Sequence, residues 1–171
     1  PFQKPHPPIW CPSQGSLETV EWAAHPSRKY VYLQTYSPID SVQRYLDLYR
    51  RTAAEKYGYT ASSDKIGWCA PLYVAETDEQ AIAEAKPHIE AMFNVFLPKV
   101  SEMMFFPPGY MSNASLKNIF AHKQIARYEP TRIEGLIEKG IFICGSPDTV
   151  RRKLTEAHNR LGFQELLSML Q

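Results

Sequence analysis

Residues 9–24 decide the fold of this chain and read Ile9-Trp10-Cys11-Pro12-Ser13-Gln14-Gly15-Ser16-Leu17-Glu18-Thr19-Val20-Glu21-Trp22-Ala23-Ala24. The apolar run over residues 8–11 predicts a short buried strand, and Pro12 predicts its end. The next residues are small and end in Gly15, which predicts a turn. From residue 16 to residue 24 the apolar residues recur at helical spacing, so we expect a helix with one face packed back on a sheet.

The junction between this strand and this helix is a candidate phosphate site. Ser16 is the expected N-cap, and Glu18 lies in the first turn. Such a helix start points free N–H groups and the positive end of a dipole at whatever lies above it, which suits a phosphate. Many such junctions carry Gly-Ser for turn and capping reasons alone, so the residues leave an ordinary capped helix open as the alternative.

Strands and helices alternate along the rest of the chain. We expect further strands over residues 29–33, 66–75 and 163–170, although the leucines of the last stretch would also suit a helix, and a short extended run over 141–144. Helices are expected to begin near Ser37, Thr77, Thr131 and Ser146, with Ser37 as the cap of its helix. This alternation predicts parallel βα units. Residues 97–128 fit no clean period. They read as an irregular insertion, packed on the surface of the domain or acting as a substrate lid or subunit contact.

Two helices have clear apolar faces. The first face comprises Val42, Tyr45, Leu46, Tyr49 and Ala53, and the second comprises Ala81, Ile82, Ala85, Ile89, Met92, Phe93 and Phe96. The second is interpreted as a packing surface, not as a cofactor site. Pro87 falls inside the second pattern, where it predicts a kink or a break.

Composition sets broad limits. The chain has 171 residues, about one domain, of which 44% are hydrophobic and 22% charged. A net charge of +1 gives no indication of nucleic acid or an anionic membrane surface, and we find no membrane-spanning run or signal peptide. Cys11, Cys69 and Cys144 read as buried thiols of a reducing compartment, so we expect a cytoplasmic protein. The chain begins at Pro1 and ends in an apolar run, and we expect a fragment.

Other chemistry is weakly represented in the sequence. No histidine pair has metal-ligand spacing, so we expect no metal site, and there is no Ser-His-Asp pattern, dinucleotide fingerprint or P-loop. We interpret residues 145–148 as a structural helix start, because Pro147 suits the first helical position and Asp148 would compete with a phosphate. Gln34 and Tyr36 are expected either to line a ligand pocket or to close a surface loop.

Four stretches resemble the bacterial luciferase-like family of flavin-dependent monooxygenases. They are Gln3-Lys4-Pro5-His6-Pro7-Pro8-Ile9-Trp10, then Gly15-Ser16-x-x-Thr19 with Glu21-Trp22-Ala23-Ala24, then residues 73–79, and finally Gly145-Ser146-Pro147-Asp148-Thr149-Val150. They occur in the family's order and extend to about residue 163. The family fold is a TIM (β/α)8 barrel, and the resemblance implies that residues 1–171 are its C-terminal half, strands 5 to 8, in a single domain.

The resemblance also implies a cofactor site. Ser16 and Thr19 match hydroxyl residues that hold the flavin phosphate in the family, and the N–H groups of Gly15 to Leu17 would assist. Gly15, Ser16, Leu17 and Thr19 are therefore the expected FMN-binding residues. An arginine that helps to hold the phosphate, and the catalytic residues, are expected upstream of Pro1.

The implied reaction is a monooxygenation. Reduced FMN, supplied by a separate flavin reductase, reacts with O2, and oxygen is transferred to a small organic substrate. Relatives that use the deazaflavin F420 as dehydrogenases or reductases, a non-catalytic barrel subunit, and a phosphate-binding barrel without redox chemistry stay open as alternatives. We expect a homodimer or heterodimer, and these residues alone are expected to be inactive, since a half-barrel exposes sheet edges.

Overall fold

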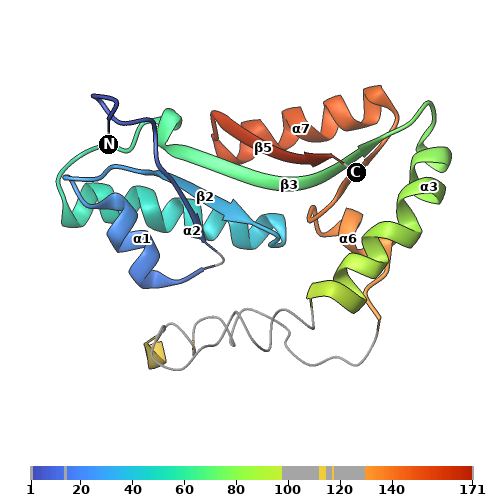
Figure 1. The fold of residues 1–171 in the computed structure, drawn as a ribbon, viewed down its shortest axis with the longest axis horizontal. Helices are drawn as coiled ribbons and strands as arrows, with labels where there is room; N and C mark the ends of the chain where they lie inside the picture. The colour runs from blue at the N-terminus through green and yellow to red at the C-terminus, as the bar shows by residue number, and fades with distance from the viewer. Residues whose placement is uncertain (1, 14, 98–111, 115–116, 118–129, 171) are drawn as a thin grey trace.

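A sheet of five parallel strands forms the centre of the molecule (Figure 1). The structure is a computed structural model that describes residues 2–13, 15–97, 112–114, 117 and 130–170. Its strands are β1 (Trp10–Ser13), β2 (Val31–Thr35), β3 (Ile66–Val74), β4 (Ile143–Gly145) and β5 (Glu165–Leu170). The parallel pairing and the alternation with helices confirm the predicted α/β class, and the arrangement fits part of a (β/α)8 barrel.

β3 is the longest strand and holds the sheet together. Its residues Gly67–Cys69 pair with both β2 and β5, so these two strands lie on opposite edges of β3. β1 pairs with β2, and β4 pairs with the carboxyl-terminal end of β3. Residues 141–144, expected to be an extra extended piece, therefore contribute a strand to the main sheet.

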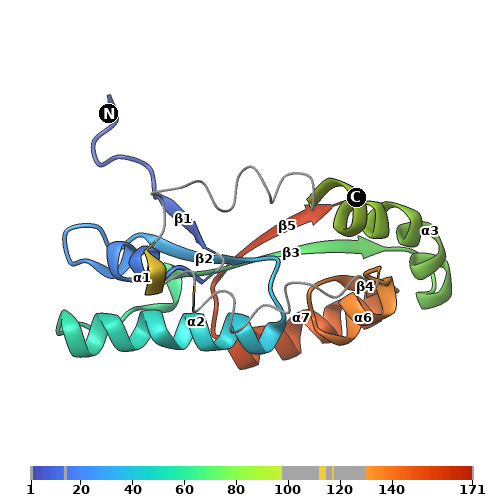
Figure 2. The same cartoon turned by 90° about the horizontal axis from the view of Figure 1, so that it is seen from below.

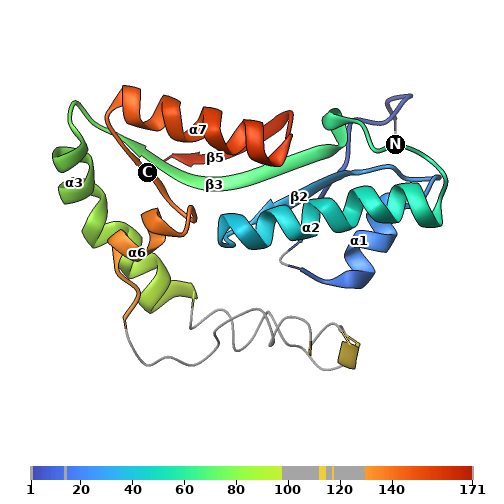
Figure 3. The ribbon, with the colours of Figure 1, turned by 180° about the vertical axis from the view of Figure 1, so that it is seen from behind.

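Three helices cover one side of the sheet: α1 (Leu17–Ala24), α2 (Ile39–Arg51) and α7 (Pro147–Leu161). Figure 2 shows α2 and α7 on the same side of the strands, and Figure 3 shows that each runs along the sheet. Their core contains Tyr32, Trp68 and Tyr49, and the Tyr32 and Tyr49 rings stack with centroids 5.1 Å apart. We call this side the helix-covered face and the other side the inner face.

The predicted apolar face of α2 is confirmed, since Val42, Tyr45, Leu46, Tyr49 and Ala53 are all buried. Its predicted cap is wrong. The N-cap is Pro38, and the Ser37 hydroxyl donates to the Thr35 carbonyl at 3.1 Å instead. The helix widens into π-type turns, η1 (Thr52–Lys56), before Gly58 ends it with a φ of 69°. A short 3-10 turn, η2 (Ser63–Lys65), leads into β3.

A second core lies beside the carboxyl end of β3. It is formed by α3 (Asp78–Ala91), its π-type continuation η3 (Met92–Phe96), and α6 (Ile133–Glu138). Ala81, Ala85 and Ile89 are buried there as predicted. The helix continues through Pro87 without a break. Phe96 is 65% exposed, so its assignment to the packed face is wrong.

Most of the irregular insertion lies outside the described residues, so its interpretation as lid or surface excursion stays a prediction. Within the described part of the chain, no helix is both long and apolar enough to cross a membrane.

Candidate functional site

The carboxyl end of β1 leads into α1 through a tight turn at Gly15. This residue has a φ of 110°, a conformation that residues with a Cβ rarely adopt. Its N–H donates to Ser13 Oγ at 3.1 Å. Ser16 caps α1 as predicted, because its Oγ accepts from the Thr19 N–H at 3.4 Å, and its hydroxyl donates to Glu18 Oε2 at 2.9 Å. The Ser16 side chain is thus engaged within its own helix turn.

Close packing below the turn makes a glycine necessary at position 15. A Cβ there would lie 2.3 Å from Cζ of Tyr45 on α2. The Tyr32 phenol beside it faces Ser13 and accepts a hydrogen bond from Gln34 Nε2 at 2.8 Å. Burial raises the pKa of Tyr32 far above its usual range, so the phenol is neutral. The turn therefore rests on buried aromatic side chains of β2 and α2.

The junction between β4 and α7 repeats this pattern. Residues 15–20 read Gly-Ser-Leu-Glu-Thr-Val, and residues 145–150 read Gly-Ser-Pro-Asp-Thr-Val. Gly145 also has a positive φ, of 150°, and Ser146 Oγ also accepts from a threonine N–H, that of Thr149, at 3.4 Å. Pro147 takes the first helical position, which agrees with the predicted structural helix start. The two junctions therefore share the same local structure, a glycine of positive φ followed by a serine N-cap that accepts from a threonine N–H.

A carboxylate from another element sits at the positive end of α7. Asp78, the first residue of α3, accepts from the Ser146 N–H at 2.6 Å and from the Thr149 hydroxyl at 2.9 Å. A Cβ at Gly145 would lie 2.7 Å from Asp78 Oδ1, so the glycine makes room for this oxygen. The hydrogen bonds from Ser146 and Thr149, aided by the charge of Lys153, lower the pKa of Asp78. The second junction therefore binds an oxyanion.

Asp78 was not among the residues predicted for this helix start. Asp148 was expected to be its carboxylate, but Asp148 pairs with Arg151 at 2.9 Å and is exposed. The repeated six-residue pattern was the available signal, because it marks both junctions as equivalent. Nothing local to Asp78 indicates its partner, which lies 68 residues away.

The first junction offers the same donors. The structure brings Gly15, Ser16, Leu17 and Thr19 together at one helix start. Over the described residues, neither the Ser16 N–H nor the Thr19 hydroxyl has a hydrogen-bond partner, whereas the equivalent groups of the second junction bind Asp78. The two groups are half-buried and lie at the carboxyl edge of the sheet, where barrel active sites lie.

Gln34 and Tyr36, the two polar residues near the carboxyl end of β2, lie in different environments. Gln34 is fully buried and lies on the helix-covered face with Tyr32, so it neither closes a surface loop nor faces the inner side. Among the residues that the structure describes, none bonds to its Oε1. Tyr36 is half-buried, and its hydroxyl donates to Sδ of Met169 on β5.

Metal and thiol chemistry find no support in the described part of the chain. No group of three or more His, Cys, Asp or Glu side chains there could hold a metal ion. Cys11, Cys69 and Cys144 are free and buried, as predicted, and burial raises the pKa of each thiol. They are therefore thiols and not thiolates at neutral pH.

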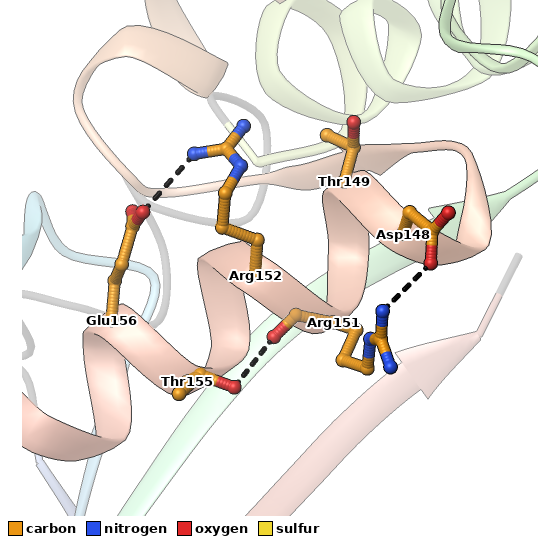
Figure 4. Close-up of a pocket in the computed structure, with 6 residues that line it drawn as sticks. All are labelled: Asp148, Thr149, Arg151, Arg152, Thr155 and Glu156. Atoms are coloured by element: carbon orange, nitrogen blue, oxygen red, sulfur yellow. Dashed lines mark hydrogen bonds and ion pairs between the residues drawn. The ribbon is translucent and has the colours of Figure 1, made fainter.

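The hollows on the helix layer are less suited to a ligand. Figure 4 shows one on the outer side of α7, where Arg151 pairs with Asp148 and Arg152 pairs with Glu156. These are exposed neighbours on one helix, typical of a solvated face. A second hollow, of about 370 Å³, lies between α2, α6 and α7. Its arginines Arg152 and Arg160 are already paired, with Glu156 and Asp40.

Comparison with solved structures gives the same fold. The oxygenating constituent of 3,6-diketocamphane monooxygenase from Pseudomonas putida, a type II Baeyer-Villiger monooxygenase in complex with FMN, matches with a TM-score of 0.62 and 19% identity over 94% of this chain and 40% of that one. Monooxygenase RslO1 from Streptomyces bottropensis matches with a TM-score of 0.58 and 20% identity over 99% and 42%. Long-chain alkane monooxygenase LadA matches with a TM-score of 0.59 and 16% identity over 95% and 36%.

The chain thus spans about two fifths of the length of these structures. A comparison with curated proteins found no match. A family model described as luciferase-like monooxygenase matches residues 1–165, nearly the whole chain. On this match the chain belongs to the luciferase-like monooxygenase family.

Proposed function

We propose that the protein containing this chain is a flavin-dependent monooxygenase that binds the phosphate of FMN at the start of α1. In this proposal a separate reductase supplies reduced FMN, and O2 and a small organic substrate complete the reaction. The family membership supports the reaction class. The chain covers about two fifths of the solved structures it resembles, so the activity belongs to the whole protein.

One observation carries the phosphate site. The Gly-Ser-x-x-Thr-Val pattern occurs at two helix starts, and at the second it binds the Asp78 carboxylate through the Ser146 N–H and the Thr149 hydroxyl. A carboxylate and a phosphate present similar oxygens to such donors. The equivalent donors of the first junction, the Ser16 N–H and the Thr19 hydroxyl, have no partner in the described part of the chain. The residues present therefore fit the group.

This comparison refines the role of Ser16. Its hydroxyl is occupied by the cap and by Glu18, so Ser16 contributes its N–H, as Ser146 does for Asp78. The side-chain ligand is Thr19, and the Leu17 N–H belongs to the same helix start, whereas the Gly15 N–H already donates to Ser13 Oγ. Bound reduced FMN would supply the reactivity toward O2, and this chain binds the phosphate and fixes its position.

The test is a pair of threonine substitutions in the complete protein. Thr19→Val removes the hydroxyl of the proposed site, and Thr149→Val is the same change at the junction that Asp78 fills. A charge-assisted hydrogen bond contributes about 1.5–3 kcal/mol, so Thr19→Val should weaken FMN binding roughly 10- to 100-fold in a fluorescence titration. Riboflavin, which has no phosphate, should bind Thr19→Val as it binds the wild type.

The control separates a ligand site from a helix cap. Thr149→Val should leave FMN affinity unchanged. Equal losses for FMN and riboflavin in Thr19→Val, or an equal effect of Thr149→Val on FMN, would show that the first junction only starts a helix. Binding of the deazaflavin F420 in place of FMN would identify the alternative cofactor, and binding of neither would leave a non-catalytic barrel subunit.

A further inference from the structure

Tyr36 has an unusual backbone at the carboxyl edge of the sheet. It directly follows β2 and adopts a φ of 48°, in the left-handed region that bulky residues avoid. Lys29, the other non-glycine residue of positive φ in the described ranges, sits in a turn closed by its own N–H, which donates to the His25 carbonyl at 3.0 Å. At Tyr36 the conformation has another consequence, because it changes the side of the sheet that the ring reaches.

The alternation of side chains along the strands defines the two sides. Tyr32 and Gln34 of β2 lie on the helix-covered face, so a continued strand would send the next even position there too. The Tyr36 hydroxyl instead contacts Met169 of β5. Met169 pairs with Pro71 of β3, out of phase with the helix-facing pair Ala70 and Ser168, and so faces the inner side.

The Tyr36 side chain therefore crosses the inner face of β3 near the carboxyl ends of the strands. β3 lies between β2 and β5 in the sheet. Cys69 of β3 lies close enough to raise the pKa of the Tyr36 phenol, although burial is the larger cause. The phenol is thus a neutral donor at physiological pH. α2 and α7 lie together on the helix-covered face of the sheet (Figure 2), and the buried residues of α1 belong to the core on that face.

The present partner of the hydroxyl is a weak one. A thioether sulfur is a poor hydrogen-bond acceptor, and a carbonyl oxygen is a much better one. Leu33 of β2 and Cys69 of β3, which also lie out of phase with the helix-facing residues, are apolar and buried. The half-buried Tyr36 hydroxyl is therefore a polar donor next to apolar and sulfur-bearing side chains.

We propose that the Tyr36 hydroxyl donates to the oxygen of a small, otherwise apolar carbonyl substrate, which takes the place of the Met169 sulfur. Tyr36 is then the residue that distinguishes a ketone or aldehyde from a hydrocarbon of equal shape. The inference rests on the proposed function for its substrate. Its test uses direct binding, so the two can fail separately.

The experiment compares two probes of nearly equal shape, cyclohexanone and methylenecyclohexane, by calorimetry on the complete protein. The wild type should prefer cyclohexanone. Tyr36→Phe keeps the ring and should weaken cyclohexanone binding about 3- to 10-fold, the effect of one neutral hydrogen bond, without changing methylenecyclohexane binding. Met169→Leu removes the competing acceptor and should strengthen cyclohexanone binding. Tyr57→Phe is the matched control, because that hydroxyl faces the Glu21 carbonyl near the end of α1, and it should change neither probe.

Three results would overturn the inference: no preference for cyclohexanone in the wild type, equal effects of Tyr36→Phe on both probes, or an equal effect of Tyr57→Phe. A wild-type protein that does not bind FMN would overturn the proposed function and not this inference. The two probes can then be compared on the protein without flavin.

Discussion

Oδ1 of Asp78 lies 2.6 Å from the backbone nitrogen of Ser146, although 68 residues separate the two in the chain. Asp78 begins α3, and Ser146 caps α7, so one carboxylate lies at the positive ends of two helices. The contact joins the second core to the helix layer. It also shows what the first junction, with the same six-residue pattern, can bind.

The charge of Asp78 should stabilise the protein at neutral pH. Asp78→Asn keeps one acceptor oxygen but removes the charge, so we expect a lower Tm at pH 7. The native pKa of Asp78 is lowered, so its stabilisation is complete above the ordinary aspartate range near pH 4 and is lost as pH falls through the native pKa. The Tm difference between wild type and variant should therefore shrink in acid. Asp148→Asn, on the exposed side of α7, is the control and should change little at either pH. A difference that does not depend on pH would contradict the role of the charge.

Glu18 should oppose FMN binding. Its carboxylate lies in the first turn of α1 and accepts from the Ser16 hydroxyl at 2.9 Å, beside the proposed phosphate donors. Glu18→Gln in the complete protein should strengthen FMN binding about 2- to 5-fold, as expected for removing one partly exposed like charge. The gain should decrease between 0.05 and 0.5 M salt, since salt screens exposed charges. A gain of equal size for riboflavin would argue against a phosphate at this position.

Ile89 should be important for stability. Its side chain is fully buried in the second core, and Ile89→Ala should lower the free energy of unfolding by about 2–5 kcal/mol. Phe96, on the continuation of the same helix, is 65% exposed and serves as the control. Phe96→Ala should change stability by less than about 0.5 kcal/mol in denaturant titrations of the complete protein. Similar losses in both variants would show that Phe96 is covered in the complete protein.

A glycine can be required by its backbone conformation or by a lack of space for a Cβ, and Gly15 and Gly58 allow the two effects to be compared. Both have a positive φ, but a Cβ at Gly15 would meet the Tyr45 ring, whereas nothing lies within 4 Å of a Cβ at Gly58. Gly58→Ala should therefore carry only the backbone penalty, about 1–2 kcal/mol. Gly15→Ala should lose roughly 1–3 kcal/mol more through overpacking, measured in the same denaturant titration. Equal losses would mean that Tyr45 moves aside without penalty.

Residues 1–171 expressed alone should associate. Among the described residues β1 pairs only with β2, which leaves one edge of the sheet open, and Leu166 and Leu167 of β5 are exposed. Open strand edges and exposed apolar side chains favour pairing between molecules. Sedimentation should show concentration-dependent association of this piece. A monomer with one sharp, concentration-independent unfolding transition would contradict the prediction.

Much of the fold could be predicted from the sequence, because the signals are local. Ser16 was identified as a helix cap and residues 145–148 as a helix start from residues a few positions apart, and Ser16 and Ser146 do cap their helices. Boundaries were less accurate: the strand expected over residues 8–11 is Trp10–Ser13, since pairing with β2 and not propensity sets its ends. Ser37 was predicted as a cap, but its hydroxyl donates to the carbonyl of Thr35, two residues earlier, instead.

The sequence by itself determined the alternation of strands and helices, the buried faces of α2 and α3, and the glycine-serine junctions, since each depends on residues a few positions apart. Only the tertiary structure decided which junction holds a carboxylate, and on which side of the sheet Tyr36 lies. Asp78 and Ser146, like Tyr36 and Met169, come from distant segments. Their contacts depend on the register of parallel strands and on one backbone conformation, and no local sequence pattern specifies either.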